Sequence, residues 1–350
     1  MSKEKPIFIY IFPYKFTEFN YYLAELDNYK NETKLEVWDI SPIINRDFSK
    51  EISSPRSSRK EVITFISISS YFSKLRKIKK ISKYREIIFL SEMVWDSPRA
   101  FFLSLVFFVM MKNTKIKLVD FFNGGVPLNF NDSSSLSISF YRKAKLFLKN
   151  TSSVMEFNRR FVNFVLVKIS AFFESIITHR LVAGEQWLKY IQNQNKKKQP
   201  ELIYGHSNDF SHYLKEKNKK IFKKNKTAVF LDSAGPAFTS DSALTGRKVY
   251  FTSDKWYPSL CNFFDFVESK TFVEVKILGH YKSNHISKSP IFGGREIIYG
   301  ETLKMIKECD YVITRNSTAI SFAVLFKKPV IFVFSNQLVD DREAIENIFG

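Results

Sequence analysis

The sequence predicts an α/β protein made of two doubly wound, Rossmann-like domains that face each other across a cleft. Short apolar segments typical of buried strands alternate along the chain with segments of helical periodicity. Alternation of this kind is characteristic of parallel sheets that are covered by helices on both faces. The 350 residues, 45% of them hydrophobic, are enough for two domains that each have a core.

The first domain is expected to cover residues 1–214. It begins with an apolar strand over 7–11 and a helix over 16–29, followed by a strand over 35–40 that ends at a Ser41-Pro42 break. Further strands are expected at 62–68, 86–90, 115–120, 181–183 and 201–204.

Two segments of the first domain bear on contact with a membrane. Phe101–Met111 is strongly apolar but falls short of the ~20 residues that a spanning helix needs, so it predicts a buried or an interfacial helix. Residues 153–177 place apolar side chains at helical spacing, which is typical of a core helix or of one that lies among lipid headgroups. We expect no segment to cross a bilayer.

A hydrophilic run over 215–226 is interpreted as the linker to a second domain, 227–350. This domain repeats the scheme of alternating strands and helices. Its strands are expected at 227–232, 273–278, 310–314 and 329–334, and its helices at 254–269, 301–308, 317–326 and 340–348.

Charge and cysteine content limit the function classes. The net charge of +19 indicates an anionic partner or surface, but no finger, homeodomain-like or RNP-type pattern is present, so nucleic acid is not favoured. The basic runs 74–85, 196–198 and 215–226 fit either a solvated face with a linker or attraction to an anionic inner leaflet. Two cysteines form neither a disulfide framework nor a zinc motif, and we expect no signal peptide before the first strand, because its apolar run is short and interrupted. We therefore expect a cytoplasmic protein, peripheral on the inner face of the membrane.

The turn Asn316-Ser317-Thr318 lies where a predicted strand ends and a helix begins. Free backbone N–H groups and the positive end of the helix dipole favour an anion at such a place, most often a phosphate. His280, Lys282 and Ser283 follow another strand at the same edge of the sheet, where a cation can neutralise a phosphate leaving group. Neither segment is a P-loop or a G-x-G-x-x-G motif, so ATPase and dinucleotide-binding functions lose support.

Carboxylates also follow predicted strands. Asp232 could act as a nucleophile, as a general base or as a cap of the next loop, and Asp241 follows in the same loop. In the first domain, Glu185 and Asp209 could supply a second carboxylate and acceptor contacts, or could equally be helix N-caps. Asn123 lies in a Gly-Gly turn that is either near the acceptor or a plain loop.

The second half of the chain, about 200–335, resembles GT-B glycosyltransferases of bacterial surface polysaccharide assembly. The resemblance rests on the order of these features: Asp232; an aromatic helix with Tyr257, Phe263, Phe264 and Glu268; His280; Tyr299-Gly-Glu-Thr; Asn316-Ser-Thr-Ala; and Lys328-Pro329. Within that group the pattern is most similar to that of enzymes that use CMP-activated ulosonic acids, such as the retaining Kdo transferases and, more distantly, bacterial sialyltransferases.

That resemblance implies a CMP-sugar donor whose phosphate contacts His280, Ser317 and Thr318, with Asp232 as a carboxylate nucleophile and no metal or cofactor. Tyr281 stands where the family has a proline. The expected function is transfer of a sugar such as Kdo to a glycan or lipid-linked acceptor in lipopolysaccharide, O-antigen or capsule assembly. Two alternatives stay open: a polyol-phosphate transferase of the teichoic-acid type, and a non-catalytic adaptor with a decayed site.

Overall fold

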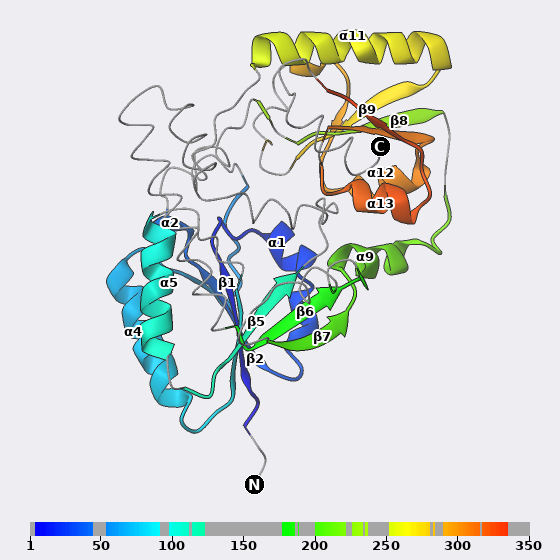
Figure 1. Ribbon diagram of the computed structural model, residues 1–350. Coiled ribbons are helices and arrows are strands. Elements are labelled where there is room, and N and C mark those ends of the chain that lie inside the picture. Colours follow the sequence, from blue (N-terminus) through cyan, green and yellow to red (C-terminus); the bar gives the residue numbers. More distant parts are fainter. Residues whose placement is uncertain are drawn as a thin grey trace, which may run out of the picture.

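Two separate parallel sheets form the framework of the protein (Figure 1). The computed structural model describes residues 4–44, 54–91, 98–111, 114–122, 177–185, 188, 200–221, 226–233, 235–236, 252–280, 283, 290–315 and 317–334. The predicted α/β class with two doubly wound sheets is confirmed.

The first sheet has seven strands in the order β3-β2-β1-β4-β5-β6-β7. Every described pairing in it is parallel, and β1 and β4 are central neighbours. This order, with the chain first winding one way and then the other, is that of a Rossmann sheet. The strands are β1 (Ile7–Phe12), β2 (Lys34–Asp39), β3 (Val62–Thr64), β4 (Ile87–Ser91), β5 (Lys117–Phe122), β6 (His179–Ala183) and β7 (Glu201–Gly205).

Helices cover both faces of this sheet. The side chains of β1 alternate between a core under α2 (Ser41–Ile44), α4 (Ile68–Ile81) and α5 (Pro98–Met111), and a core under α1 (Glu18–Leu23) and the 3₁₀ helix η1 (Leu26–Tyr29). Alternation with a period of two is what a strand buried on both faces requires.

Several predicted bounds of the first domain were wrong. The helix expected over 16–29 is divided into α1 and η1, because Glu25 has a left-handed φ of 50°. The Ser41-Pro42 break is the start of the short helix α2. The strand expected over 62–68 ends at Thr64, since Ser67 begins α4 by accepting the N–H of Ser70. The first part of the basic run 74–85 is therefore helical.

The apolar segment Phe101–Met111 lies within α5, on the same face of the sheet as α4. Leu103 and Phe107 are buried in the core, whereas Phe102 and Val109 are exposed. Among the described residues, no helix combines the length and apolarity needed to cross a membrane. Residues 153–176 and the helix predicted at 340–348 lie outside the described residues.

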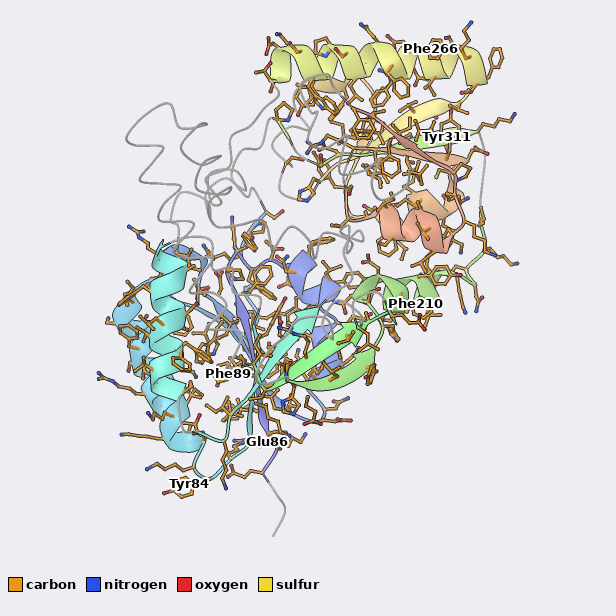
Figure 2. The ribbon with its side chains drawn as sticks, in the orientation of Figure 1. Tyr84, Glu86, Phe89, Phe210, Phe266 and Tyr311 are labelled. Atoms are coloured by element: carbon orange, nitrogen blue, oxygen red, sulfur yellow. The ribbon has the colours of Figure 1, made fainter. Side chains whose placement is uncertain are left out.

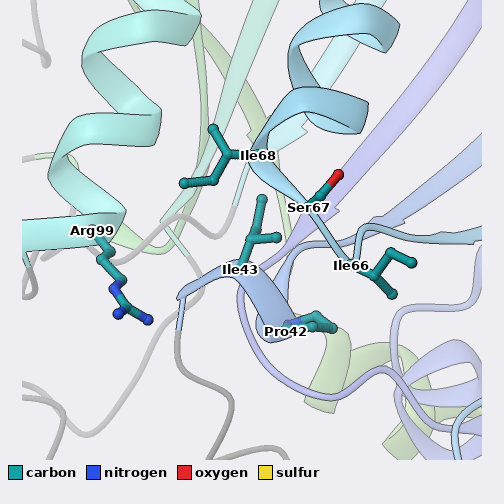
Figure 3. Close-up of a pocket in the computed structure, with 6 residues that line it drawn as sticks. All are labelled: Pro42, Ile43, Ile66, Ser67, Ile68 and Arg99. Atoms are coloured by element: carbon teal, nitrogen blue, oxygen red, sulfur yellow. The ribbon is translucent and has the colours of Figure 1, made fainter.

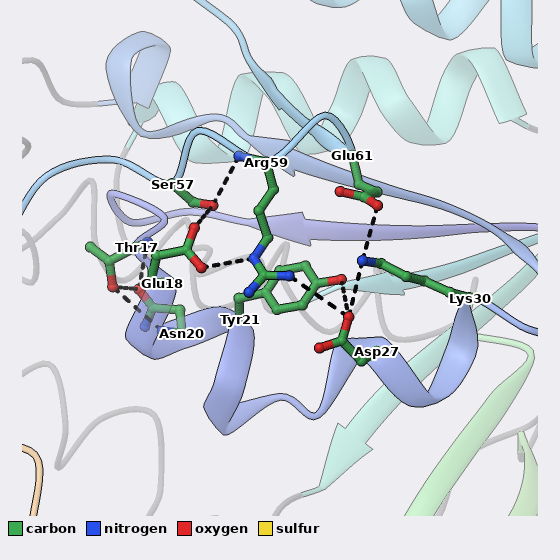
Figure 4. A network of polar contacts seen from close by, with 9 residues as sticks. All are labelled: Thr17, Glu18, Asn20, Tyr21, Asp27, Lys30, Ser57, Arg59 and Glu61. Atoms are coloured by element: carbon green, nitrogen blue, oxygen red, sulfur yellow. Dashed lines mark hydrogen bonds and ion pairs between the residues drawn. The ribbon is translucent and has the colours of Figure 1, made fainter.

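A polar network fixes the segment that leads into β3 against α1 and η1 (Figure 4). The guanidinium of Arg59 lies over the ring of Tyr21, with Cζ of Arg59 4.0 Å from the ring centroid. Nε of Arg59 donates to the carboxylate of Glu18. The Tyr21 hydroxyl donates to Asp27 over 3.1 Å, and Lys30 forms an ion pair with Glu61 at 3.0 Å. These contacts hold the segment before β3 against α1 and η1, while β3 itself pairs with β2.

The second sheet has five parallel strands in the order β10-β9-β8-β11-β12. They are β8 (Thr227–Leu231), β9 (Glu274–Leu278), β10 (Ile297–Ile298), β11 (Tyr311–Thr314) and β12 (Val330–Phe332). One face packs on α11 (Ser253–Thr271) and the 3₁₀ helix η5 (Pro290–Phe292), and the other on α12 (Thr302–Glu308) and α13 (Ile320–Leu325). Strand β10 was not predicted.

The helix α9 (Asn208–Glu216) lies between the two sheets and contacts elements of both (Figure 1). On the side of the second sheet, the buried ammonium of Lys307 donates to the backbone oxygens of Glu216 and Lys219. The ring of Tyr213 packs against that of Phe326, with 4.9 Å between centroids. On the side of the first sheet, Lys215 forms an ion pair with Glu25 at 2.7 Å. Residues 215–220 belong to the stretch that was predicted to be a linker, and they take part in this contact.

Candidate functional site

The central strands β8 and β11 form the switch point of the second sheet, because the chain continues from β8 toward one edge and from β11 toward the other. In open α/β sheets, ligands bind outside the carboxyl ends of the strands at such a point. Leu231 pairs with Thr314 in the register, so the residues that follow, Asp232 and Arg315, leave neighbouring strand ends. Both are buried, with 5% and 9% of their surfaces exposed.

Ser283 holds the carboxylate of Asp232. Its hydroxyl lies 3.1 Å from Oδ2 of Asp232 and 2.9 Å from the backbone oxygen of His280, and it is fully buried. The backbone N–H of Ser283 also donates to the His280 oxygen, at 2.8 Å. The loop after β9 thus folds back on itself and places one hydroxyl on the carboxylate.

Tyr299 supports this loop from the end of β10. Its hydroxyl donates to the backbone oxygen of Ser283 over 3.2 Å. Burial, and next the negative charge of Asp232, raise the pKa of the Tyr299 hydroxyl, so it stays a donor at neutral pH. The ring lies on the backbone of Gly279, where a Cβ would be only 2.3 Å from Cε1 of Tyr299. Glycine is the residue that permits this close approach.

Arg315 and Ser233 complete the described site, and neither was identified from the sequence. Nη2 of Arg315 donates to the Ser233 hydroxyl over 3.4 Å. A guanidinium offers a planar set of donors that suits a phosphate. The available signal was its position, because Arg315 directly follows the buried strand β11.

The predicted anion turn has a different geometry from the one expected. Helix α13 begins at Ile320 and has only six residues. The N–H of Ala319 donates to Oγ of Ser317, and the N–H groups of Ile320 and Ser321 donate to backbone oxygens three residues back. The prediction of free N–H groups at this turn was wrong because the turn satisfies them itself. A ligand at this turn would therefore meet the side chains of Ser317, which is half-buried, and of Thr318, which is exposed.

The other predicted residues are dispersed. His280 is half-buried at the end of β9, close to Ser283. Glu185 is exposed after β6, in the first sheet, beside Gly184 with a φ of 91°. Lys282, Asn316, Asn123 and Asp241 lie outside the described residues. Among the residues that are described, no cluster of His, Cys, Asp and Glu could hold a metal ion.

Asp209, expected on the acceptor side, is part of the contact between the domains. It lies in the first turn of α9, and its Oδ2 accepts a hydrogen bond from the hydroxyl of Ser321 on α13. Burial raises the pKa of the Asp209 carboxyl, while Ser321 and the nearby His212 lower it less strongly. This carboxylate is therefore already used in holding α9 against the second domain.

Comparison with known proteins finds no matching family and no matching curated protein. Solved structures with a similar chain course include the wall teichoic acid polymerase TagF, at 12% identity and a TM-score of 0.49 over 94% of this chain and 70% of that one. Another is UGT2 of Phytolacca americana, bound to UDP-2fluoro-glucose and pterostilbene, at 8% identity and a TM-score of 0.49 over 96% and 82%. A third is the UDP-GlcNAc 2-epimerase of Methanocaldococcus jannaschii, at 11% identity and a TM-score of 0.47 over 97% of this chain and 86% of that one.

The two sheets themselves define the fold. Two Rossmann-like sheets, each with its switch point between two central strands, occur in a single chain. This is the GT-B arrangement, the fold that the sequence predicted.

Gly279→Ala tests the packing of Tyr299. The added Cβ would lie 2.3 Å from Cε1 of Tyr299, and moving the ring would break the hydrogen bond of its hydroxyl to Ser283, so we expect a loss of about 1–3 kcal/mol in the free energy of unfolding. Gly205→Ala is the matched control, since its Cβ would meet nothing nearer than 3.4 Å. Chemical denaturation measures both, and adding Tyr299→Ala to Gly279→Ala should relieve the collision. Equal stability of the two single variants would contradict the packing described.

Asp209→Asn tests the buried carboxyl of the domain contact. Because the pKa of Asp209 is raised in the folded protein, ionisation opposes folding as the pH rises above the unfolded pKa near 4. We expect the asparagine variant to be more stable than the parent at pH 7 and to lose that advantage as the pH falls toward 4, where the carboxyl is neutral. Melting temperatures across this range measure the difference, which should not be constant with pH.

Proposed function

We propose that the protein is a glycosyltransferase that uses a nucleotide-activated sugar, bound at the switch point of the second sheet in a cleft between the domains. One observation carries the proposal: a buried carboxylate, Asp232, and a buried guanidinium, Arg315, follow the two central strands side by side. A sugar nucleotide needs both kinds of group, a cation for its phosphate and a carboxylate near the anomeric carbon.

The proposed reaction divides the work between these groups. Asp232 bonds to the anomeric carbon as the bond from that carbon to the phosphate oxygen breaks, and the electron pair leaves with the nucleotide. Arg315, with His280 at the same strand ends, stabilises the charge on the departing phosphate. The hydrogen bond from Ser283 orients the carboxylate over 3.1 Å. An acceptor hydroxyl then attacks the anomeric carbon, and the electron pair of the bond to Asp232 returns to the carboxylate. The hydroxyl proton passes to the departing nucleotide phosphate, and after two displacements the product retains the configuration of the donor.

For the donor we propose a CMP-activated ulosonic acid such as Kdo, and for the product a bacterial surface polysaccharide. The support is the order of Asp232, His280 and Ser317-Thr318 along the chain, which resembles that of CMP-sugar transferases. The side chains of Ser317 and Thr318 remain accessible for a phosphate, although the N–H groups of the turn are satisfied within it.

We further propose that the protein works at an anionic membrane surface, bound through the basic end of α4. No acidic residue occurs in 68–85. Tyr84, 91% exposed, extends from the turn after α4 (Figure 2), and tyrosine is common at membrane interfaces. Within the described part of the chain, five exposed cations of this surface form no ion pair: Arg76, Lys77, Lys79, Lys80 and Lys83.

Asp232→Asn should abolish sugar transfer and leave nucleotide binding nearly unchanged, because only the nucleophile is lost. Arg315→Gln should instead weaken nucleotide binding at least about ten-fold through lost bonds to a charged phosphate. Titration calorimetry with CMP, UDP, GDP and CDP-glycerol, together with a transfer assay, measures both effects, and Asp254→Asn on the exposed start of α11 is the control. Full activity of Asp232→Asn, or absence of binding to every nucleotide, would refute the proposal, and a preference for CDP-glycerol would favour polyol-phosphate transfer.

Replacement of Lys79 and Lys80 by glutamine should weaken binding to phosphatidylglycerol vesicles by about 2 kcal/mol, or ~30-fold, at low salt. The matched control replaces Lys217 and Lys220, which are equally exposed cations near the domain contact. Vesicle co-sedimentation measures the two variants. Equal losses in both would mean that attraction follows net charge and not the α4 surface.

A further inference from the structure

A pocket of about 430 Å³ lies at the carboxyl end of the first sheet (Figure 3). It is formed by α2, the loop after β3 and the starts of α4 and α5. Among the residues that the structure describes, the lining includes Pro42, Ile43, Ile66, Ser67, Ile68 and Arg99, and four of these are apolar. No group of the proposed donor site belongs to it.

Apolar side chains of this pocket are left in water. Ile66 is 73% exposed and Ile68 is 39% exposed. Covering branched side chains like these is favourable by about 25 cal/mol for each Å² removed from water. The exposed side chains of Ile66 and Ile68 would therefore be stabilised by contact with a hydrocarbon ligand.

The apolar surface continues from the pocket along α5. Phe102 and Val109 are exposed and lie three and ten residues beyond Arg99, on one side of the helix. The ring of Phe102 meets that of Phe72 on α4, with 6.4 Å between centroids. Ten residues of helix extend ~15 Å, which is room for a chain of many carbon atoms. We call this line from Ile66 and Ile68 to Val109 the α5 strip.

Among the described lining residues of the pocket, Arg99 is the charged one. Its guanidinium is exposed and forms no ion pair with any described residue. An exposed guanidinium at the mouth of an apolar pocket suits an anion attached to hydrocarbon, and its planar donors match a phosphate.

We propose that the pocket and the α5 strip bind a hydrocarbon phosphate, with the phosphate on Arg99 and the chain along α5. The proposal rests on the proposed function, because a glycan acceptor carried on such a lipid would be held by the first domain while the second domain holds the donor. It names the acceptor class as a lipid-linked phosphate. The pocket lies at the carboxyl end of its sheet, where ligands of this fold bind.

Calorimetric titration of the full chain with farnesyl monophosphate, without any nucleotide, tests the proposal. We expect binding that falls at least about ten-fold in Arg99→Gln and in Ile68→Gln, from loss of a charged hydrogen bond and of apolar contact. The matched controls are Lys255→Gln on α11 and Ile203→Gln on β7, which lie outside the pocket and outside the α4 surface, and Ile203 is 39% exposed, as Ile68 is. Both controls should bind as the parent does, and equal melting temperatures check that all four variants fold.

Farnesol and inorganic phosphate separate the two parts of the ligand, and each alone should bind at least about ten-fold more weakly. No binding of farnesyl monophosphate, equal binding of farnesol, or equal losses in the control variants would overturn the proposal. The proposal would also be overturned if Arg99→Gln and Ile68→Gln bound farnesyl monophosphate normally and lost only their binding to phosphatidylglycerol vesicles, because the strip would then be a bilayer contact. Nucleotide titration of the same protein reports separately on the donor site, so the two proposals can fail independently.

Discussion

The structure depends on one constraint, the burial of both faces of a parallel sheet. In β1, Ile7, Ile9 and Ile11 enter one core while Phe8, Tyr10 and Phe12 enter the other. A strand that is buried on both faces carries mainly apolar side chains, because a buried polar group needs a partner, and parallel neighbours require a crossover after each strand. Polar residues therefore gather where strands end. The same constraint in the second sheet brings Asp232 and Arg315 together, although 82 positions of sequence separate Ser233 from Arg315.

The constraint also decides what could be predicted from the sequence. Strands such as β1 and β8 are nearly continuous apolar runs, and such a run can be recognised within the segment itself. Element ends depend on single backbone conformations or caps, such as the left-handed Glu25 and the Ser67 cap of α4, and the apolar pattern does not show these. Strand β10 has two residues and is held only by its pairing with β9, so it has no local signal.

The site shows the same division. Asp232 could be predicted because it follows a buried strand, but its contact with Ser283 and the support from Tyr299 depend on distances between segments far apart in the chain. The turn at Ser317 was misjudged because the side chain and backbone of that residue accept the N–H groups that the helix start was expected to leave free. The sequence position of Asp209, after a predicted strand, is typical of a site residue, yet the residue belongs to the contact between the domains. Its hydrogen bond with Ser321 shows this, and the sequence does not reveal that bond.

The helix α9 has a mechanical consequence. Toward the second domain it is held by a buried ammonium that donates to two backbone oxygens and by the edge-to-face contact of the Tyr213 and Phe326 rings. Toward the first domain it is held by the exposed cation Lys215 and by His212, whose Nε2 lies 3.3 Å from the backbone oxygen of Leu23. Buried, charge-assisted bonds cost more to break than exposed ion pairs. A bending motion between the domains would therefore open at the surface of α1, and α9 would swing as a rigid part of the second domain although it precedes that domain in the chain.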